Sequence, residues 1–187
     1  MIFVVSAASG TGKTTILKIL ANVYKIPRLT TFTTRPVRRD EKNGRDYYFH
    51  TKKEFQNLIA SNSLTEWASV YGFYYGTPRA ELEASLKKRR PIVLALDTHG
   101  AAQIKAQYPK QTVLVALLPP SRAELKNRIR NRQKETGENN SDVKKRLSEV
   151  NKELKILAGY DYRIVNETPE KTVDLLYKII QTRMFGS

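Results

Sequence analysis

The stretch SAASGTGKTT, Ser6 to Thr15, ends in the residues GKT that are typical of a phosphate-binding loop. An apolar run precedes it and a helical pattern follows it, which is the context that such a loop requires. Successive backbone N–H groups can surround a phosphate there, and the helix N-terminus adds a partial positive charge. Ala7 stands where glycine normally begins the loop, so it is harmless only if its φ is negative.

Two side chains of this loop have specific expected roles. Lys13 would reach the β- and γ-phosphates of a bound nucleotide, and the Thr14 hydroxyl would ligate Mg²⁺. The nucleotide-binding residues predicted in the loop are Ala8, Ser9, Gly10, Thr11, Gly12, Lys13, Thr14 and Thr15.

Strand-like apolar runs recur between helical patterns along the chain. They are IFVVS (Ile2–Ser6), IVLALD (Ile92–Asp97), TVLVALL (Thr112–Leu118) and YRIVN (Tyr162–Asn166). Because these runs are nearly continuous rather than alternating, they predict strands buried on both faces of a parallel sheet. The alternation with helices indicates a three-layer α/β fold of the P-loop NTPase type.

Helix starts are marked by recognisable signals. Lys13–Tyr24 has apolar residues at helical spacing, and Thr51-x-x-Glu54 and Ser121-x-x-Glu124 have the form of a capping box. Pro169 would sit in the first turn of a last helix. That helix would turn Val173, Leu176, Tyr177 and Ile180 inward.

Two regions do not follow this alternation of strands and helices. Residues from about 28 to 78 are rich in Thr, Tyr, Arg and turn signals, and contain the strand candidates DYYFH, LTEWASV and FYYGT, so we expect a small β-rich insertion. Gln133–Asp142 is a polar stretch between two arginine-bearing helices, and we expect it to be mobile.

Composition indicates one core that carries insertions. The chain has 187 residues, of which 40% are hydrophobic, and no cysteine, so disulfide and thiol chemistry are excluded. The first residues show no signal-peptide pattern, and no apolar run reaches the length of about 20 residues that a membrane span needs, so we expect a cytoplasmic protein.

The charge is strongly positive. The 33 Lys and Arg against 18 Asp and Glu give a net charge of +15, which would attract nucleic acid, anionic membranes or small polyanions such as nucleotides. No zinc-ligand spacing or aromatic RNA-binding motif indicates a nucleic-acid module, and the phosphates of bound nucleotides can account for many of the cations. We therefore expect nucleotide ligands, and neither nucleic acid nor membrane as a partner.

The insertion resembles a known family. TTFTTRPVRRDEKNGRDYYF (Thr30–Phe49), TEWASVYGFYYGTP (Thr65–Pro78) and LDTHGA (Leu96–Ala101) are similar to three spaced motifs of the guanylate kinases. The similarity runs in order from the phosphate-binding loop to about Lys178. It implies a β-rich GMP-binding insertion, a helical lid and the transfer of phosphate from ATP to GMP, and we extend the acceptor to dGMP.

For the acceptor site, the resemblance assigns the phosphate to Arg35, Arg38, Tyr47 and Tyr75, and guanidinium groups and hydroxyl donors suit such a dianion. It assigns the base to Glu66, whose carboxylate can accept both N1–H and N2–H of guanine, whereas adenine has a lone pair at N1. The resemblance completes the guanine pocket with Thr31, Thr77 and Asp97.

For the donor site and lid, the resemblance assigns Arg132 and Arg146 to the transferring phosphate, since arginines there neutralise developing charge. It places Arg128 on the adenine side, with Asn166 and Thr168 as adenine contacts. The expected regions are a core of about 1–30, 79–127 and 147–187, an insertion of about 31–78 and a lid of about 128–146.

The chain departs from the family pattern in places. Ala95 stands where the family carries an aspartate linked to Mg²⁺, so water or another carboxylate must complete the outer shell of the metal. His99 replaces a glutamine, and Asp40 replaces a glycine near Arg38. These departures leave three readings: an active ATP:GMP phosphotransferase, a kinase for another nucleotide or a sugar phosphate, and an interaction module without catalysis.

Overall fold

The computed structural model describes residues 1–125, 127–128 and 140–186, with side chains left undescribed at 140–147. The elements in chain order are β1 (Ile2–Ala7), α1 (Lys13–Tyr24), β2 (Phe32–Thr33), β3 (Tyr48–Phe49), α2 (Lys52–Ala60), β4 (Leu64–Val70), β5 (Phe73–Pro78), α3 (Arg79–Lys87), β6 (Ile92–Ala95), α4 (Thr98–Gln107), β7 (Thr112–Leu118), α6 (Asn140–Leu157), β8 (Tyr162–Val165) and α7 (Pro169–Phe185).

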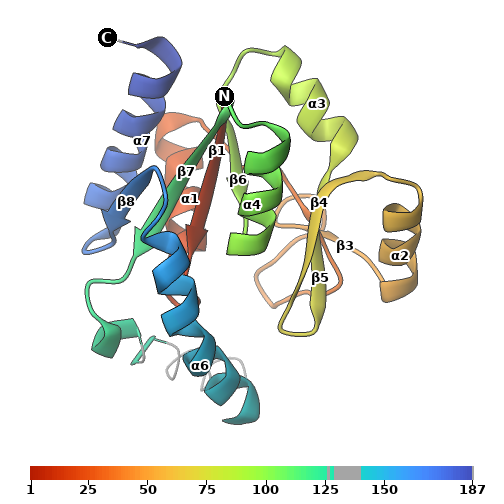
Figure 1. The fold of residues 1–187 in the computed structure, drawn as a ribbon, viewed down its shortest axis with the longest axis horizontal. Helices are drawn as coiled ribbons and strands as arrows, with labels where there is room; N and C mark the ends of the chain where they lie inside the picture. The colour runs from red at the N-terminus through yellow and green to blue at the C-terminus, as the bar shows by residue number, and fades with distance from the viewer. Residues whose placement is uncertain (126, 129–139, 187) are drawn as a thin grey trace.

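The core sheet has the strand order β6-β1-β7-β8, and all of its pairings are parallel. Strand β1 lies in its middle and is buried on both faces. Phe3 and Val5 pack with residues of α1 and α7, whereas Ile2 and Val4 pack with residues of α3, α4 and α6. Figure 1 shows these helices on either side of the sheet. The predicted three-layer α/β fold with a parallel core sheet is confirmed.

The predicted helix signals are also confirmed where the chain is described. Helix α1 has the predicted bounds, and α7 begins with Pro169 in its first turn. The Thr51 side chain and the Glu54 backbone and side chain form both halves of a capping box at the start of α2. The Ser121 hydroxyl accepts a hydrogen bond from the Glu124 N–H at 3.1 Å.

The insertion forms a second sheet with the order β3-β2-β5-β4. Strands β4 and β5 pair antiparallel as a hairpin, and β2 pairs parallel with β3. The ring of Phe55 on α2 is fully buried and stacks on Tyr74 of β5. Figure 1 shows this sheet and α2 beside the core, on the side of β6 and α4. The predicted β-rich insertion is therefore present.

The polar stretch Gln133–Asp142 lies largely outside the described residues, and α6 already begins at Asn140. The lid boundaries therefore stay a prediction. Within the described ranges, no helix is both long enough and apolar enough to cross a membrane.

Candidate active site

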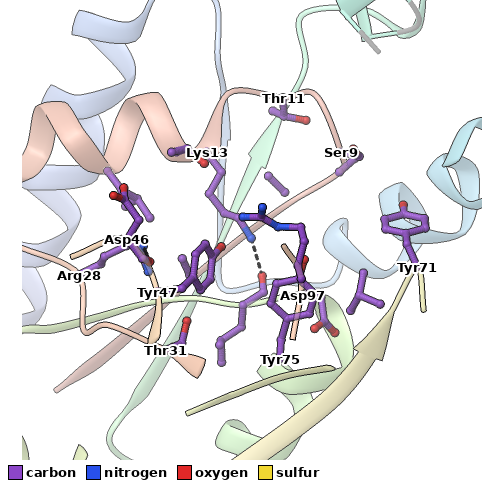
Figure 2. A pocket seen from close by; sticks show the side chains of 18 of the residues that line it. Ser9, Thr11, Lys13, Arg28, Thr31, Asp46, Tyr47, Tyr71, Tyr75 and Asp97 are labelled. Carbon is purple, nitrogen blue, oxygen red and sulfur yellow. Dashed lines mark hydrogen bonds between the residues drawn. The ribbon is translucent and has the colours of Figure 1, made fainter. Parts of the chain in front are cut away.

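One cavity of about 630 Å³ joins the carboxyl edge of the core sheet to the insertion. Figure 2 shows side chains from both sides entering it. Its walls bring together most of the residues that the sequence predicts. Those present are Ala8 to Thr14 of the loop, Thr31, Arg35, Arg38, Tyr47, Glu66, Tyr75, Asp97 and Arg128.

The phosphate loop, Ala7–Thr14, follows β1 directly. Ala7 is the last residue of that strand, pairs with Leu117 and does not have a positive φ. The left-handed positions of the loop are occupied by Gly10 and Gly12, at φ 86° and 100°. The expected condition for a harmless Ala7 is therefore met, because the glycines stand where the loop needs them.

Lys13 points from the start of α1 into the cavity (Figure 2). Its Nζ donates a hydrogen bond to the Leu96 carbonyl at 2.9 Å. Burial of the ammonium group lowers the pKa of Lys13 to about 8, and the carboxylates of Asp97 and Glu153 oppose that shift. Lys13 is therefore still mostly positive at neutral pH and lies where a nucleotide phosphate would enter.

Arg35 is held in place by neighbours within the insertion. Its Nη2 donates to both oxygens of Glu41 at 2.7 and 2.9 Å, and its Nη1 donates to the Pro36 carbonyl. Burial alone would raise the pKa of Glu41, but the hydrogen bonds from Arg35 and from the Arg38 N–H lower it. Because one nitrogen serves both carboxylate oxygens, Arg35 keeps further N–H donors for a ligand.

Tyr47 and Tyr75 form an aromatic wall, with ring centroids 6.0 Å apart. Arg28 lies over the Tyr47 ring at 4.9 Å and donates to the Asp46 carbonyl. The Arg28 Nη1 is buried and has no hydrogen-bond partner among the described residues. Burial raises the pKa of Tyr47, so its phenol stays neutral and can donate to an anion.

Glu66 lies on β4 and is only 2% exposed. The Thr77 hydroxyl donates to its Oε1 at 2.5 Å. A Cβ added at Gly100 would lie 2.6 Å from its Oε2, so only glycine leaves room for this carboxylate. Burial, with a contribution from Asp97, raises the pKa of Glu66 to about 7. The site therefore holds a buried hydrogen-bond acceptor, the Glu66 carboxylate, which is partly protonated near neutral pH.

Two more predicted guanine-pocket residues have defined places. Thr31 is 2% exposed and lies at the wall of the cavity, just before β2. Asp97 is the N-cap of α4, where its Oδ1 accepts from the N–H groups of His99 at 2.7 Å and Gly100 at 3.2 Å. Asp97 thereby fixes the helix turn that packs against Glu66.

Four predicted nucleotide-binding residues do not line the cavity: Thr77, which lies on β5 and contacts Glu66, and Thr15, Asn166 and Thr168. Thr15 is exposed on α1, and Thr168 is exposed at the N-cap of α7. Asn166 is 5% exposed and donates to the Thr11 carbonyl at 2.6 Å, while its Oδ1 accepts from Thr172 at 3.0 Å. Asn166 thus supports the phosphate loop from behind, and its contact with adenine stays a prediction.

The predicted lid arginines are described only in part. Arg128 lines the cavity, and its Nε donates to Glu124 Oε1 at 2.8 Å. Arg132 lies outside the described residues, and Arg146 falls in the part of α6 whose side chains are outside them. The roles of these two arginines stay predictions.

The cavity also contains side chains that sequence reasoning missed: Arg28, Glu41, Asp46, Tyr71 and Glu153. Glu41 stands inside the quoted motif and could have been found as the acidic neighbour of two arginines. Glu153 gave no signal, because it comes from α6, far along the chain. Its carboxylate accepts a hydrogen bond from the Ser9 N–H, and burial raises its pKa.

The side chains at the loop fit Mg²⁺ only if the nucleotide shares in binding it. The Thr14 hydroxyl is exposed at the start of α1, but no group of three or more His, Cys, Asp or Glu side chains that could hold a metal is found in the described ranges. Mg²⁺ typically takes few protein ligands together with phosphate oxygens and water. Thr14 beside a phosphate loop provides that kind of site.

The chain is similar to known proteins over nearly its whole length. Residues 1–183 match the family model of guanylate kinase. A guanylate kinase from Syntrophus aciditrophicus is 40% identical over 95% of this chain and 84% of its own, and one from Clostridium tetani is 38% identical over 96% and 85%.

The fold leads to the same family. The crystal structure of a guanylate kinase from Anaplasma phagocytophilum superposes with a TM-score of 0.82 at 31% sequence identity, covering 99% of this chain and 86% of that one. With the phosphate loop and the insertion meeting at one cavity, these matches show that the chain belongs to the guanylate kinase family of nucleoside monophosphate kinases.

Proposed function

We propose that this protein transfers the γ-phosphoryl group of ATP to the phosphate of GMP or dGMP and releases ADP together with GDP or dGDP. The observation that carries the proposal is the shared cavity, in which Lys13 of the phosphate loop and Glu66 of the insertion both line the walls. The cavity, of about 630 Å³, has the size of a ligand pocket and brings residues of the loop and of the insertion together.

The donor side acts through backbone groups and one cation. The amides of the phosphate loop and the N-terminus of α1 would hold the phosphates of ATP, and Lys13 would leave the Leu96 carbonyl for a phosphate oxygen. Mg²⁺, held by Thr14 and the phosphates, would supply further charge neutralisation when bound. Arg128, and the predicted Arg132 and Arg146, would add positive charge around the transferring group.

The acceptor side acts through side chains. Arg35, Arg38, Tyr47 and Tyr75 would bind the phosphate of GMP, so that one of its oxygens faces the donor. Because this phosphate is already an anionic nucleophile at neutral pH, no protein group needs to remove a proton. Catalysis would then consist of alignment and charge neutralisation.

Selection of guanine would rest on Glu66. Its ionised carboxylate can accept N1–H and N2–H of the base, while Thr77 and the turn at Gly100 hold it in place. Adenine would leave a buried carboxylate facing a lone pair. Sites built on such hydrogen bonds reject the wrong partner by about 10⁴–10⁵.

The experiment that tests this proposal measures ADP release with GMP, dGMP, AMP, CMP, UMP and ribose phosphate offered in parallel. We expect rapid turnover with GMP and dGMP alone. If another nucleotide or a sugar phosphate is preferred, GMP is not the acceptor and Glu66 does not have the proposed role. If the folded protein shows no turnover with any acceptor, the remaining interpretation is an interaction module without catalysis.

A further inference from the structure

A carboxylate on the phosphate side of the cavity has no role in the reaction derived above. Glu153 of α6 lines this wall, and its carboxylate accepts a hydrogen bond from the Ser9 N–H. Its Oε2 is buried and has no hydrogen-bond partner in the described part of the chain. A buried carboxylate oxygen without a partner costs free energy, so a partner in the ligand-bound state is expected.

The surroundings of Glu153 indicate which partner that is. Glu153 and Asp97 both stabilise the ammonium group of Lys13, so the two carboxylates share one neighbourhood with the cation that reaches the donor phosphates. A bare carboxylate there would repel a triphosphate. A divalent cation between the two anions turns this repulsion into attraction.

Few other acceptors are open at this place. Ala95, at the end of β6, also lines the cavity but has no carboxylate. The Oδ1 of Asp97 already accepts two N–H groups as the N-cap of α4, so only its Oδ2 could serve there. Mg²⁺ bound to a nucleotide keeps several water molecules, and these donate hydrogen bonds to nearby carboxylates. The Oε2 of Glu153 is a buried oxygen that can still accept such a hydrogen bond.

We propose that Glu153 is the outer-shell carboxylate of the Mg²⁺ that accompanies the donor nucleotide, and that it fills the place left by Ala95. The proposal rests on the proposed function for the identity of the donor. Glu153 does not touch the reacting atoms; it is a positioning residue that orients the hydration shell of the ion.

The test measures metal binding without turnover. Mn²⁺ is titrated into the complex of the full-length protein with ADP, and free Mn²⁺ is read by electron paramagnetic resonance. The variant Glu153→Gln keeps the size of the side chain and an oxygen that can accept from Ser9. We expect it to weaken Mn²⁺ binding about tenfold, the lower end of the effect of losing an outer-shell partner.

A matched control lies on the exposed face of α3. Glu83→Gln removes the same charge from a residue that does not line the cavity, and it should leave Mn²⁺ affinity unchanged. Adding Ala95→Asp to the Glu153→Gln variant should restore the affinity, because the carboxylate returns from the end of β6.

The outcomes separate this proposal from the proposed function. If the wild-type protein binds neither ADP nor GMP, the proposed function fails. If Glu153→Gln binds Mn²⁺ as tightly as the wild type does, the proposed role of Glu153 is overturned. It is also overturned if this variant loses ADP binding in the absence of metal, because that loss would indicate that Glu153 only supports Ser9. Failure of Ala95→Asp to restore the affinity overturns the claim that Glu153 fills that place.

Discussion

The two halves of the cavity are built in different ways. The half that we propose for the donor is one continuous loop between β1 and α1, where backbone amides would be the main binding groups. The acceptor half is assembled from side chains that come from separate segments: Arg35 before α2, Glu66 on β4, Tyr75 on β5 and Asp97 after β6. A local loop can hold any triphosphate, whereas separate side chains can select one base.

This difference predicts which half of the cavity tolerates substitutions and which half is sensitive to them. The loop accepts Ala7 in place of glycine because its left-handed residues are elsewhere. Glu66, in contrast, depends on Thr77 at one oxygen and on the absence of a side chain at Gly100 beside the other. Changes in the loop should therefore affect the donor and the rate, and changes around Glu66 should affect the choice of acceptor.

The largest effect is expected from Lys13→Ala. Removing the cation that we propose for the donor phosphates should lower kcat by about 10³-fold, similar to the loss of one strong transition-state donor. Steady-state ADP release measures it. The control Lys171→Ala removes an exposed charge from the first turn of α7 and should leave kcat unchanged. Retained turnover in Lys13→Ala would mean that the loop does not hold the donor.

Glu66→Gln should come next. An amide cannot accept both guanine N–H groups, so kcat/KM for GMP should fall by about 10²-fold or more. Kinetics at varied GMP concentration measure it, with Glu83→Gln on the exposed face of α3 as the charge-matched control. An unchanged preference for GMP over AMP would contradict the role of Glu66.

Gly100→Ala probes the same carboxylate from behind. The new Cβ would lie 2.6 Å from Glu66 Oε2 and must displace it. Overpacking of about 2 kcal/mol corresponds to roughly 30-fold weaker GMP binding. Gly159→Ala is the control, since its Cβ would meet only the Ile156 carbonyl at 3.5 Å. Equal GMP affinities in the two variants would show that Gly100 leaves Glu66 free to move.

The smallest effect is the pH dependence of GMP binding. The pKa of Glu66 is raised to about 7, and only the ionised form accepts both N–H groups, so affinity should fall about tenfold from pH 8 to pH 6. Because the GMP phosphate also titrates near pH 6, Glu66→Gln is titrated in parallel to isolate the carboxylate. Identical pH profiles in both proteins would assign the whole dependence to the phosphate.

Folding should show the opposite trend. The folded pKa of Glu66 lies above its ordinary value of 4.5, so the contribution of Glu66 to the free energy of unfolding is fully present below pH 4.5. It is lost as pH rises through about 7. Denaturant unfolding of the wild type and Glu66→Gln across this range measures it, and a Glu66 contribution that grows with pH would contradict the burial of this carboxylate.

Much of the fold could be predicted because its signals are local. The observed bounds of α1 and β7 equal the ranges that the sequence predicts from helical spacing after the loop and from a continuous apolar run, and Pro169 and the Thr51 capping box mark helix starts correctly. Such patterns depend on neighbours within a few turns of chain, so the sequence carries them directly.

The supporting contacts of the site could not be predicted, because they join distant segments. The adenine contact of Asn166 stays a prediction, and the hydrogen bond that its amide donates to the Thr11 carbonyl could not be foreseen. Glu153 reaches Ser9 from another helix. Neither contact follows from spacing, because it depends on how α6 and β8 pack against β1.

The division of labour between the two halves is tested most directly by calorimetric titration of Lys13→Ala and Glu66→Gln with each nucleotide separately. We predict that Lys13→Ala loses affinity for a non-hydrolysable ATP analogue and keeps wild-type affinity for GMP, and that Glu66→Gln does the reverse. Loss of both ligands in one variant, or of the same ligand in both variants, would contradict the account.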